Sequence, residues 1–318
     1  MTKIIMKEFM ARIRNGFFLF LFVLPFSFFS CEKDDPLIIG VAVPNLEADF
    51  FVQISNSVVD LADKDGARVL VVEAGNDGVK QVNQIQNLIK KDMDALIYIP
   101  AGASAASVPV KLCRNKGIPV ICVDRFPLDF RGDTFIASNS ISSVYNLGMW
   151  VIEQTGGIAD VAIIHGQLGT TPEVDRSKGW AMAMAEAPGM KVVAEQSADW
   201  YEHKAYEIAK KMLNEHPSIT VIFAQSDSMA LGASKAIRES GSNHKIWCVG
   251  FDGDVHALKE LKKGVFDATC TQQTQYMGQL AYKSVIDILS GKELPVEIKL
   301  NALVTTQQNV DRYIESHP

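Results

Sequence analysis

Aromatic, charged and amide residues directly follow several strand-like segments of this 318-residue chain. The face of an aromatic ring packs well against the apolar C–H face of a sugar ring. Carboxylates accept hydrogen bonds from hydroxyls, guanidinium groups donate them in a fixed fork, and amides do both. The combination predicts non-covalent binding of a hydroxyl-bearing ring. The residues concerned are Phe50, Phe51, Asp124, Arg125, Asn139, Arg176, Trp200, Asp227, Asp252 and Gln272.

Some of these residues also have a purely structural interpretation. Asp227 precedes the segment SMALGASKAI and could cap that helix instead of contacting a ligand. Phe51 could belong to the hydrophobic core, and Trp150 and Trp180 are expected to pack there. The adjacent pair Asp124-Arg125 is more informative, because opposite charges directly after an apolar strand are seldom buried unless they have a functional role. Such a pair could share sugar hydroxyls while nearly neutralising itself.

Short apolar runs alternate with amphipathic segments along the chain from Pro36 onward. Runs of β-branched residues separated by helical crossovers predict strands covered on both faces, and therefore parallel sheets. The rhythm restarts after residues 134–142, which predicts two doubly wound α/β domains with a crevice at the carboxyl ends of their strands. A final helix is expected at 276–289 and a strand-like run at 295–304. The other strands are expected at 37–43, 67–73, 94–100, 118–123, 159–166, 190–196, 219–225, 245–251 and 266–272.

The first thirty residues have the pattern of an export signal. Four basic residues precede an apolar stretch at 17–29, too short to span a bilayer with ease. The stretch ends at Ser30-Cys31, which resembles a bacterial lipoprotein box and predicts lipidation of Cys31; an uncleaved anchor or a plain secretory signal remains the alternative. The acidic segment 32–35 resembles a surface-export tag but could equally be a solvated tether. The predicted divisions are 1–30 for the signal, 31–36 for a tether, 37–138 plus 273–301 for the first domain, and 139–272 plus 302–318 for the second.

Composition and motifs exclude several function classes. The net charge is −6, and without residues 1–30 the chain keeps 27 basic and 36 acidic residues, a net charge of −9. Such an acidic chain is a poor partner for nucleic acid. No nucleophile elbow, P-loop, dinucleotide fingerprint or zinc-protease motif occurs, so we expect no catalytic residue, cofactor or metal. His165 could reach the crevice but is expected to be structural. Cys113, Cys122, Cys248 and Cys270 are expected to be buried thiols, although an export compartment would permit Cys122 to pair with Cys113 or Cys270.

Several segments together resemble the ribose-binding group of periplasmic substrate-binding proteins, the type I receptors related to LacI-type repressors. The resemblance covers about residues 37–308. It rests on FFVQI (50–54), IPVICVDR (118–125), FIASN (135–139), DRSKGW (175–180), ADW (198–200), AQSDSMALGA (224–233), VGFDG (249–253) and TQQT (271–274).

The resemblance implies a hinged two-domain receptor that captures a sugar or polyol and presents it to an ABC-type importer. A membrane sensor that reads a sugar or a furanosyl autoinducer is the alternative, and a glycosidase-type enzyme is a weaker one. A DNA-binding regulator of this fold would need a headpiece where this chain has its export signal. The receptor is expected to be monomeric and located in the periplasm or cell envelope. The implied ligand contacts are Phe50, Phe51, Asp124, Arg125, Trp200, Asp252 and Gln272.

Four departures from the ribose receptors argue against ribose itself as the ligand. Ala48 and Val174 replace an Asn and an Arg, and Ser140 and Ser226 each replace an Asn. A site built for hydroxyls discriminates between analogues through such partners, because unpaired polar groups are costly. Ser226 stays among the predicted contacts. Replacement acceptors are expected among Glu47, Asp49 and Glu173.

Overall fold

The computed structural model describes residues 36–318. The predicted export signal, the lipidation of Cys31 and most of the tether lie outside the described residues. Within residues 36–318, no helix is both long enough and apolar enough to cross a membrane.

The first lobe is built on a six-stranded sheet in which every pairing is parallel. Its strand order is β11-β5-β4-β3-β1-β2. The strands are β1 (Ile38–Val43), β2 (Arg68–Glu73), β3 (Ala95–Tyr98), β4 (Val120–Val123), β5 (Thr134–Ser138) and β11 (Glu297–Leu300). The helices that cover it are α2 (Asp49–Asp65), α3 (Gly78–Ile89), α4 (Ser107–Arg114) and α10 (Thr274–Leu289).

The second lobe repeats this arrangement with the order β12-β10-β9-β8-β6-β7. Its strands are β6 (Ile158–His165), β7 (Gly189–Ser197), β8 (Ile219–Ala224), β9 (Trp247–Val249), β10 (Ala268–Thr271) and β12 (Leu303–Thr306). Its helices are α5 (Ser140–Thr155), α6 (Thr171–Ala185), α7 (Glu202–Glu215), α8 (Asp227–Glu239), α9 (Val255–Lys262) and α11 (Asp311–Glu315). The prediction of two doubly wound α/β domains is thereby confirmed.

One strand departs from the predicted parallel arrangement. The strand-like run 295–304, which the predicted boundary at 301/302 divides between the two domains, forms β11 and β12. β11 pairs with β5 in parallel, whereas β12 pairs with β10 in the antiparallel sense. An edge strand of opposite direction is common on otherwise parallel sheets.

Each sheet is buried on both faces because successive side chains of a strand point to opposite sides. In β1, Val41 packs into the cluster formed with α2 and α10, whereas the next residue, Ala42, packs into the cluster with α3 and α4. This explains why the strands are continuous apolar runs rather than alternating ones.

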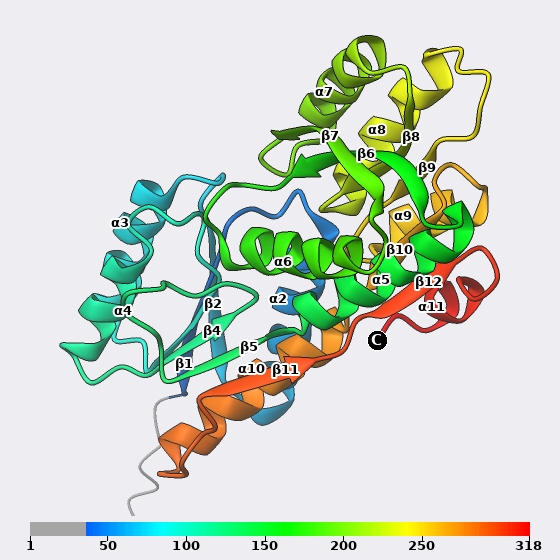
Figure 1. The fold of residues 1–318 in the computed structure, drawn as a ribbon. Coiled ribbons are helices and arrows are strands. Elements are labelled where there is room, and N and C mark those ends of the chain that lie inside the picture. Colours follow the sequence, from blue (N-terminus) through cyan, green and yellow to red (C-terminus); the bar gives the residue numbers. More distant parts are fainter. Residues whose placement is uncertain (1–35) are drawn as a thin grey trace, which may run out of the picture. The chain divides into compact units, whose positions relative to one another are not determined.

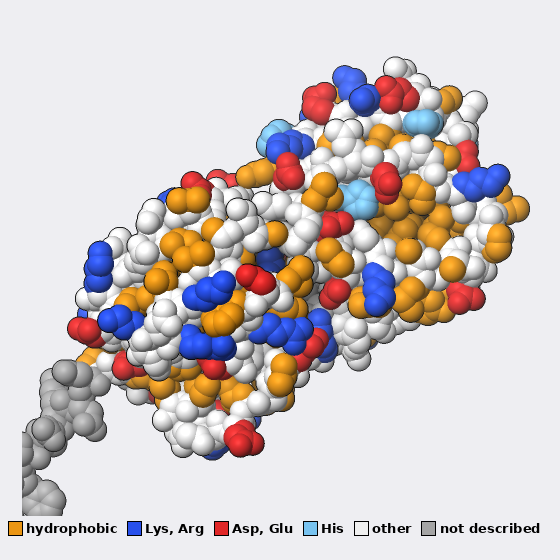
Figure 2. All heavy atoms as spheres, turned by 60° about the vertical axis from the view of Figure 1, so that its left-hand side comes forward, with side chains coloured by type: hydrophobic (Ala, Val, Ile, Leu, Met, Phe, Trp, Pro, Cys, Tyr) orange, Lys and Arg blue, Asp and Glu red, His pale blue; other side chains and the backbone are white. Residues whose placement is uncertain are grey.

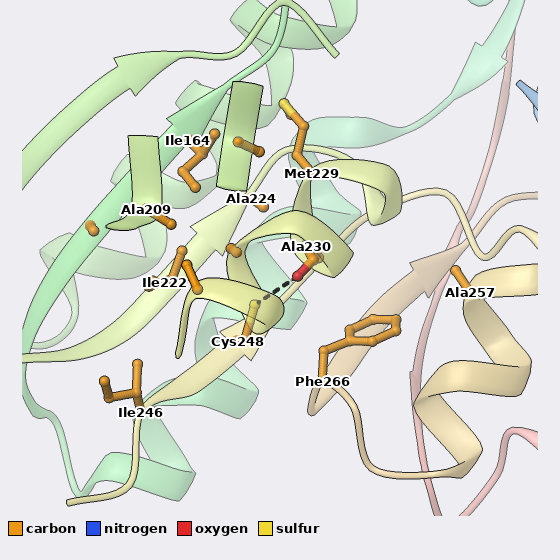
Figure 3. Close-up of a cluster of buried hydrophobic side chains, with 14 of the residues drawn as sticks. Ile164, Ala209, Ile222, Ala224, Met229, Ala230, Ile246, Cys248, Ala257 and Phe266 are labelled. Carbon is orange, nitrogen blue, oxygen red and sulfur yellow. Dashed lines mark hydrogen bonds between the residues drawn. The ribbon is translucent and has the colours of Figure 1, made fainter. Parts of the chain in front are cut away.

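The second sheet is covered in the same manner. Figure 3 shows side chains of β6 and β8, such as Ile164 and Ile222, packed against Met229 and Ala230 of α8. In the same cluster the thiol of Cys248 donates a hydrogen bond to the carbonyl of Ala230 over 3.5 Å.

The chain passes between the sheets three times, from β5 to α5, from β10 to α10 and from β11 to β12 (Figure 1). The predicted domain boundaries at 138/139, 272/273 and 301/302 fall in these segments, and we retain them as a proposal. On the face shown in Figure 2, basic and acidic side chains are interspersed among hydrophobic and uncharged ones.

Candidate functional site

A cavity of about 210 Å³ lies between the carboxyl ends of the two sets of strands. The first lobe lines it with residues that follow β1, β2 and β4, and the second lobe with residues of α6 and those that follow β7, β8 and β9. Ligands of doubly wound folds bind at this end of the strands. The lining residues are Asn45, Glu47, Ala48, Phe50, Phe51, Asn76, Asp124, Arg125, Pro172, Arg176, Asp199, Trp200, Tyr201, Glu202, Ser226, Ser228, Asp252 and Asp254.

Phe50 and Phe51 form the aromatic wall of the first lobe. They open α2, and their rings meet edge to face with centroids 5.2 Å apart. Both belong to the core cluster beneath β1 and are only 6% and 5% exposed. The two interpretations of Phe51, core residue and cavity wall, therefore apply together.

Trp200 forms the aromatic wall of the second lobe, in the loop between β7 and α7. Its ring lies directly on Gly166, where a Cβ atom would come within 2.0 Å of the ring. Trp200 also has a left-handed backbone with φ 73°. Gly166 is thus required for the observed position of the indole.

The pair Asp124 and Arg125 follows β4 and is buried, with each residue 7% exposed. Arg125 Nε donates to Asp124 Oδ2 over 3.2 Å, and Nη1 donates to the carbonyl of Pro100 over 3.3 Å. The guanidinium carbon lies 5.6 Å from the ring centroids of both Phe51 and Trp200, within reach of cation–π attraction. Burial lowers the pKa of Arg125, and the Asp124 carboxylate opposes this shift.

Asp252 is held by donors from two different elements of the second lobe. Its Oδ1 accepts from Arg176 Nη2 over 3.1 Å and from Gln272 Nε2 over 2.8 Å. Arg176 also stacks on Phe251, with 3.9 Å between the guanidinium carbon and the ring centroid, and its Nη1 donates to the carbonyl of Gln225. Gln272 is 1% exposed and lies behind the cavity wall, where it orients Asp252.

Asp227 is completely buried beneath the cavity and does not line it. Its carboxylate accepts from the backbone of Gly253 over 2.7 Å and from Thr269 Oγ1 over 2.6 Å. Burial, and then the neighbouring carboxylate of Asp252, raise the pKa of Asp227. The interpretation of Asp227 as a helix cap is wrong, because the cap of α8 is Ser226, whose hydroxyl accepts from the backbone of Met229 over 3.3 Å.

Besides Gln272 and Asp227, three further predicted residues lie away from the cavity lining. The backbone of Asn139 donates to the carbonyl of Leu300 over 2.7 Å at a crossing between the sheets, and its side chain lines a separate cavity of about 380 Å³ that also contains Val174. Glu173 accepts from the backbone of Gly169 and from Ser177. Asp49 accepts from Gln53 within α2. Glu47, in contrast, lies in the cavity wall.

Several lining residues were not predicted, among them Asn76, Tyr201 and Asp254. The side-chain amide of Asn76 in the first lobe donates to the hydroxyl of Tyr201 in the second over 3.0 Å. Asn76 also accepts from Asn45 over 2.9 Å. These residues thus link the two walls by a direct hydrogen bond.

Backbone strain is concentrated at the cavity. Non-glycine residues with positive φ are uncommon, and they cluster at functional sites where the surrounding structure holds them in place. Five of the seven such residues among residues 36–318 line this cavity: Asn76, Asp124, Asp199, Trp200 and Asp252.

The described cysteines are all free and buried. Burial raises the pKa of Cys113, Cys122 and Cys248 to about 12, so these thiols are held protonated. His165 bridges Glu173 and Glu195 in the second lobe over 3.3 and 3.2 Å and does not line the cavity. Within residues 36–318, no group of three or more potential ligands is arranged to hold a metal ion.

Comparison with known proteins identifies a family model, a relative and a solved structure that this chain resembles. Residues 39–293 match the model of the periplasmic binding protein domain. The chain is 33% identical to the ribose import binding protein of Bacillus subtilis over 270 residues, 85% of this chain and 87% of that protein. It resembles the structure of an ABC transporter solute binding protein from Bacillus halodurans with bound myo-inositol, with 26% identity, a TM-score of 0.82, and coverage of 88% of this chain and 97% of that chain.

A domain of a hybrid two-component system is similarly related to this chain. The fructose binding periplasmic domain of a hybrid two-component system is 26% identical, with a TM-score of 0.82, over 88% of this chain and 93% of that domain. Since the family model and the relatives span most of the described residues, and since the two lobes enclose a cavity at their strand ends, the chain belongs to the type I group of the periplasmic binding protein family.

Proposed function

We propose that this protein is an extracytoplasmic receptor that binds one monosaccharide or related polyol between its two lobes, without chemical conversion. The observation that carries the proposal is the cavity whose aromatic walls come from opposite lobes and whose polar walls are the Asp124–Arg125 and Asp252–Arg176 pairs. Aromatic faces suit the C–H face of a sugar, and the charged pairs suit its hydroxyls.

The size of the cavity favours a small ligand. Its volume of about 210 Å³ is below the ~300–1,000 Å³ of sites for drug-sized molecules, which favours a single ring over an oligosaccharide. Ala48 lines the cavity as an apolar residue, and Val174 lies outside it. Ala48 cannot supply the hydrogen bonds of the Asn that the ribose receptors carry at this position, so we propose a sugar other than ribose; Val174, outside the cavity, does not bear on the ligand.

We further propose that ligand binding stabilises the closed arrangement of the lobes and that a membrane partner reads this closure. The partner is an ABC-type importer, in keeping with the ribose import relative. A membrane sensor is the second candidate, favoured by the likeness to the fructose binding domain of a two-component system. The proposed lipid anchor at Cys31 would keep the receptor, as a monomer, at the membrane.

The test is thermal unfolding of a form that starts at residue 32, with a panel of pentoses, hexoses, deoxysugars, polyols and nucleosides. A ligand at ~100 times its dissociation constant stabilises by about 2.7 kcal/mol, which gives a shift of several degrees. A clear shift with one or two related sugars, with the ligand recovered unchanged, supports the receptor. Product formation from a glycoside, or no shift across the panel, would contradict it.

A further inference from the structure

Asp254 is a carboxylate in the cavity wall that has no evident structural task. It occupies the N-cap position of α9, two residues after Asp252, yet its side chain makes no capping hydrogen bond. An N-cap aspartate ordinarily accepts from the backbone near the start of its helix. Asp254 instead lines the cavity.

The charges of the cavity wall leave Asp254 without a cation. Both arginines in the wall already contact carboxylates, Arg125 that of Asp124 over 3.2 Å and Arg176 that of Asp252 over 3.1 Å. Asp199 contacts Lys204 over 2.8 Å. In total the wall contains six carboxylates and two guanidinium groups. A negatively charged ligand is therefore disfavoured, and a positive charge on the ligand would compensate the excess.

The aromatic walls are compatible with the same kind of ligand. Phe50, Phe51 and Trp200 line the same space, and aromatic faces attract ammonium groups as well as sugar C–H groups. An ammonium group on a small ring would therefore meet a carboxylate and an aromatic surface in one cavity.

We infer that Asp254 selects a ligand that carries a protonated amine, such as an aminosugar or an amino-polyol. The inference rests on the proposed sugar site and specifies its ligand. Burial, together with the carboxylates of Asp252, Asp227 and Asp49, raises the pKa of Asp254 well above its usual range, and an ammonium group beside it would reverse that shift. Neutral sugars lack this compensation and bind more weakly.

The experiment is isothermal titration of the full chain at neutral pH with matched sets of probes. Each set contains an amine, its neutral parent and its N-acetyl form: glucosamine, glucose and N-acetylglucosamine, the corresponding galactose and mannose sets, and glucamine with sorbitol. The expected result is that the amine of at least one set binds at least about tenfold more tightly than both uncharged members, which corresponds to ~1.4 kcal/mol.

Variants assign this preference to one residue. Asp254→Asn should remove the preference for the amine and leave the affinity for the neutral parent within about twofold. Asp254→Ser, whose hydroxyl suits an N-cap, provides the same test if the Asn variant folds poorly. Glu207→Gln changes an exposed carboxylate of α7 that lies outside the cavity and should retain the preference.

Each alternative outcome has a definite meaning. Equal or tighter binding of the neutral parents overturns the inference while the proposed sugar receptor stands. An amine preference that survives Asp254→Asn overturns the role of Asp254. No binding of any member overturns the inference, whereas the proposed receptor fails only if the wider panel of the unfolding assay also gives no shift.

Discussion

Asp252 both lines the proposed ligand cavity and accepts hydrogen bonds from within the protein. Its carboxylate faces the cavity while Arg176 and Gln272 hold its Oδ1. We expect Asp252→Ala to weaken binding of the cognate ligand roughly ten- to hundredfold, because hydrogen bonds to charged groups contribute about 1.5–3 kcal/mol. Titration calorimetry measures the loss. Asp311→Ala, at an exposed position of α11, is the control, and wild-type affinity of Asp252→Ala would remove the residue from the site.

Gly166 is expected to control affinity without contacting the ligand. A Cβ atom there would overlap the Trp200 ring, which comes within 2.0–2.2 Å. We expect Gly166→Ala to displace the indole, lower the affinity and cost about 1–3 kcal/mol of stability. Binding and thermal unfolding check both effects. The double variant Gly166→Ala with Trp200→Phe, which has a smaller ring, should recover stability; the absence of recovery would place the clash elsewhere.

At the scale of elements, the loops that open α3 and α7 form a latch between the lobes. The latch is the hydrogen bond from Asn76 to the hydroxyl of Tyr201 over 3.0 Å. Tyr201→Phe removes it without altering the ring. We expect about two- to tenfold weaker binding of every ligand, with faster dissociation, since one neutral hydrogen bond contributes about 0.5–1.5 kcal/mol to the closed form.

The matched control for the latch lies on the helix that follows. Tyr206 of α7 also donates through its hydroxyl, but to Glu239 of α8 within the same lobe over 2.6 Å. Tyr206→Phe should leave affinity and dissociation rate unchanged. A selective loss for one ligand in Tyr201→Phe would instead indicate that Tyr201 contacts that ligand.

The elements were largely predictable because a strand buried on both faces leaves a continuous apolar run in the sequence. The run at 37–43 is β1, and the run at 219–225 is β8, each within one residue. Strand direction leaves no such trace, which is why the reversal between β11 and β12 was missed. Asn76 and Asp254 lie in loops, where tertiary contacts rather than periodicity determine position, and Asn76 also has a positive φ.

The candidate site was predictable where residues follow strands directly. Asp124, Arg125 and Asp252 stand at such positions and line the cavity. Asp227 stands at an equivalent position, yet it faces inward and accepts from Gly253 and Thr269. Sequence position alone does not distinguish a side chain that faces the cavity from one that supports it from below.

At the scale of the whole molecule, the buried carboxylates beneath the cavity couple stability to pH. Burial and then Asp252 raise the pKa of Asp227 from 3.8 to about 7, so the folded protein retains a proton that the unfolded chain releases above about pH 4. Between these two values a rise in pH therefore favours unfolding, by at most ~1.4 kcal/mol per pH unit for one group. Below pH 3.8 both states are protonated and this contribution is constant.

We therefore expect the free energy of unfolding of the unliganded protein to fall between pH 4 and pH 7 because of this group. Exposed carboxylates whose pKa is lowered, such as Glu73 beside Lys80, have the opposite effect, because they lose stabilisation as the pH falls toward their folded pKa. The informative quantity is therefore the difference in pH dependence between the wild type and a variant at Asp227. Asp227→Asn keeps the shape and cannot titrate. Denaturant unfolding across this pH range should show a smaller decline in the variant than in the wild type. If the wild type and Asp227→Asn lose stability in parallel with pH, Asp227 is ionised in the folded protein. Arg176, 3.1 Å from Asp252, would then neutralise the buried carboxylates.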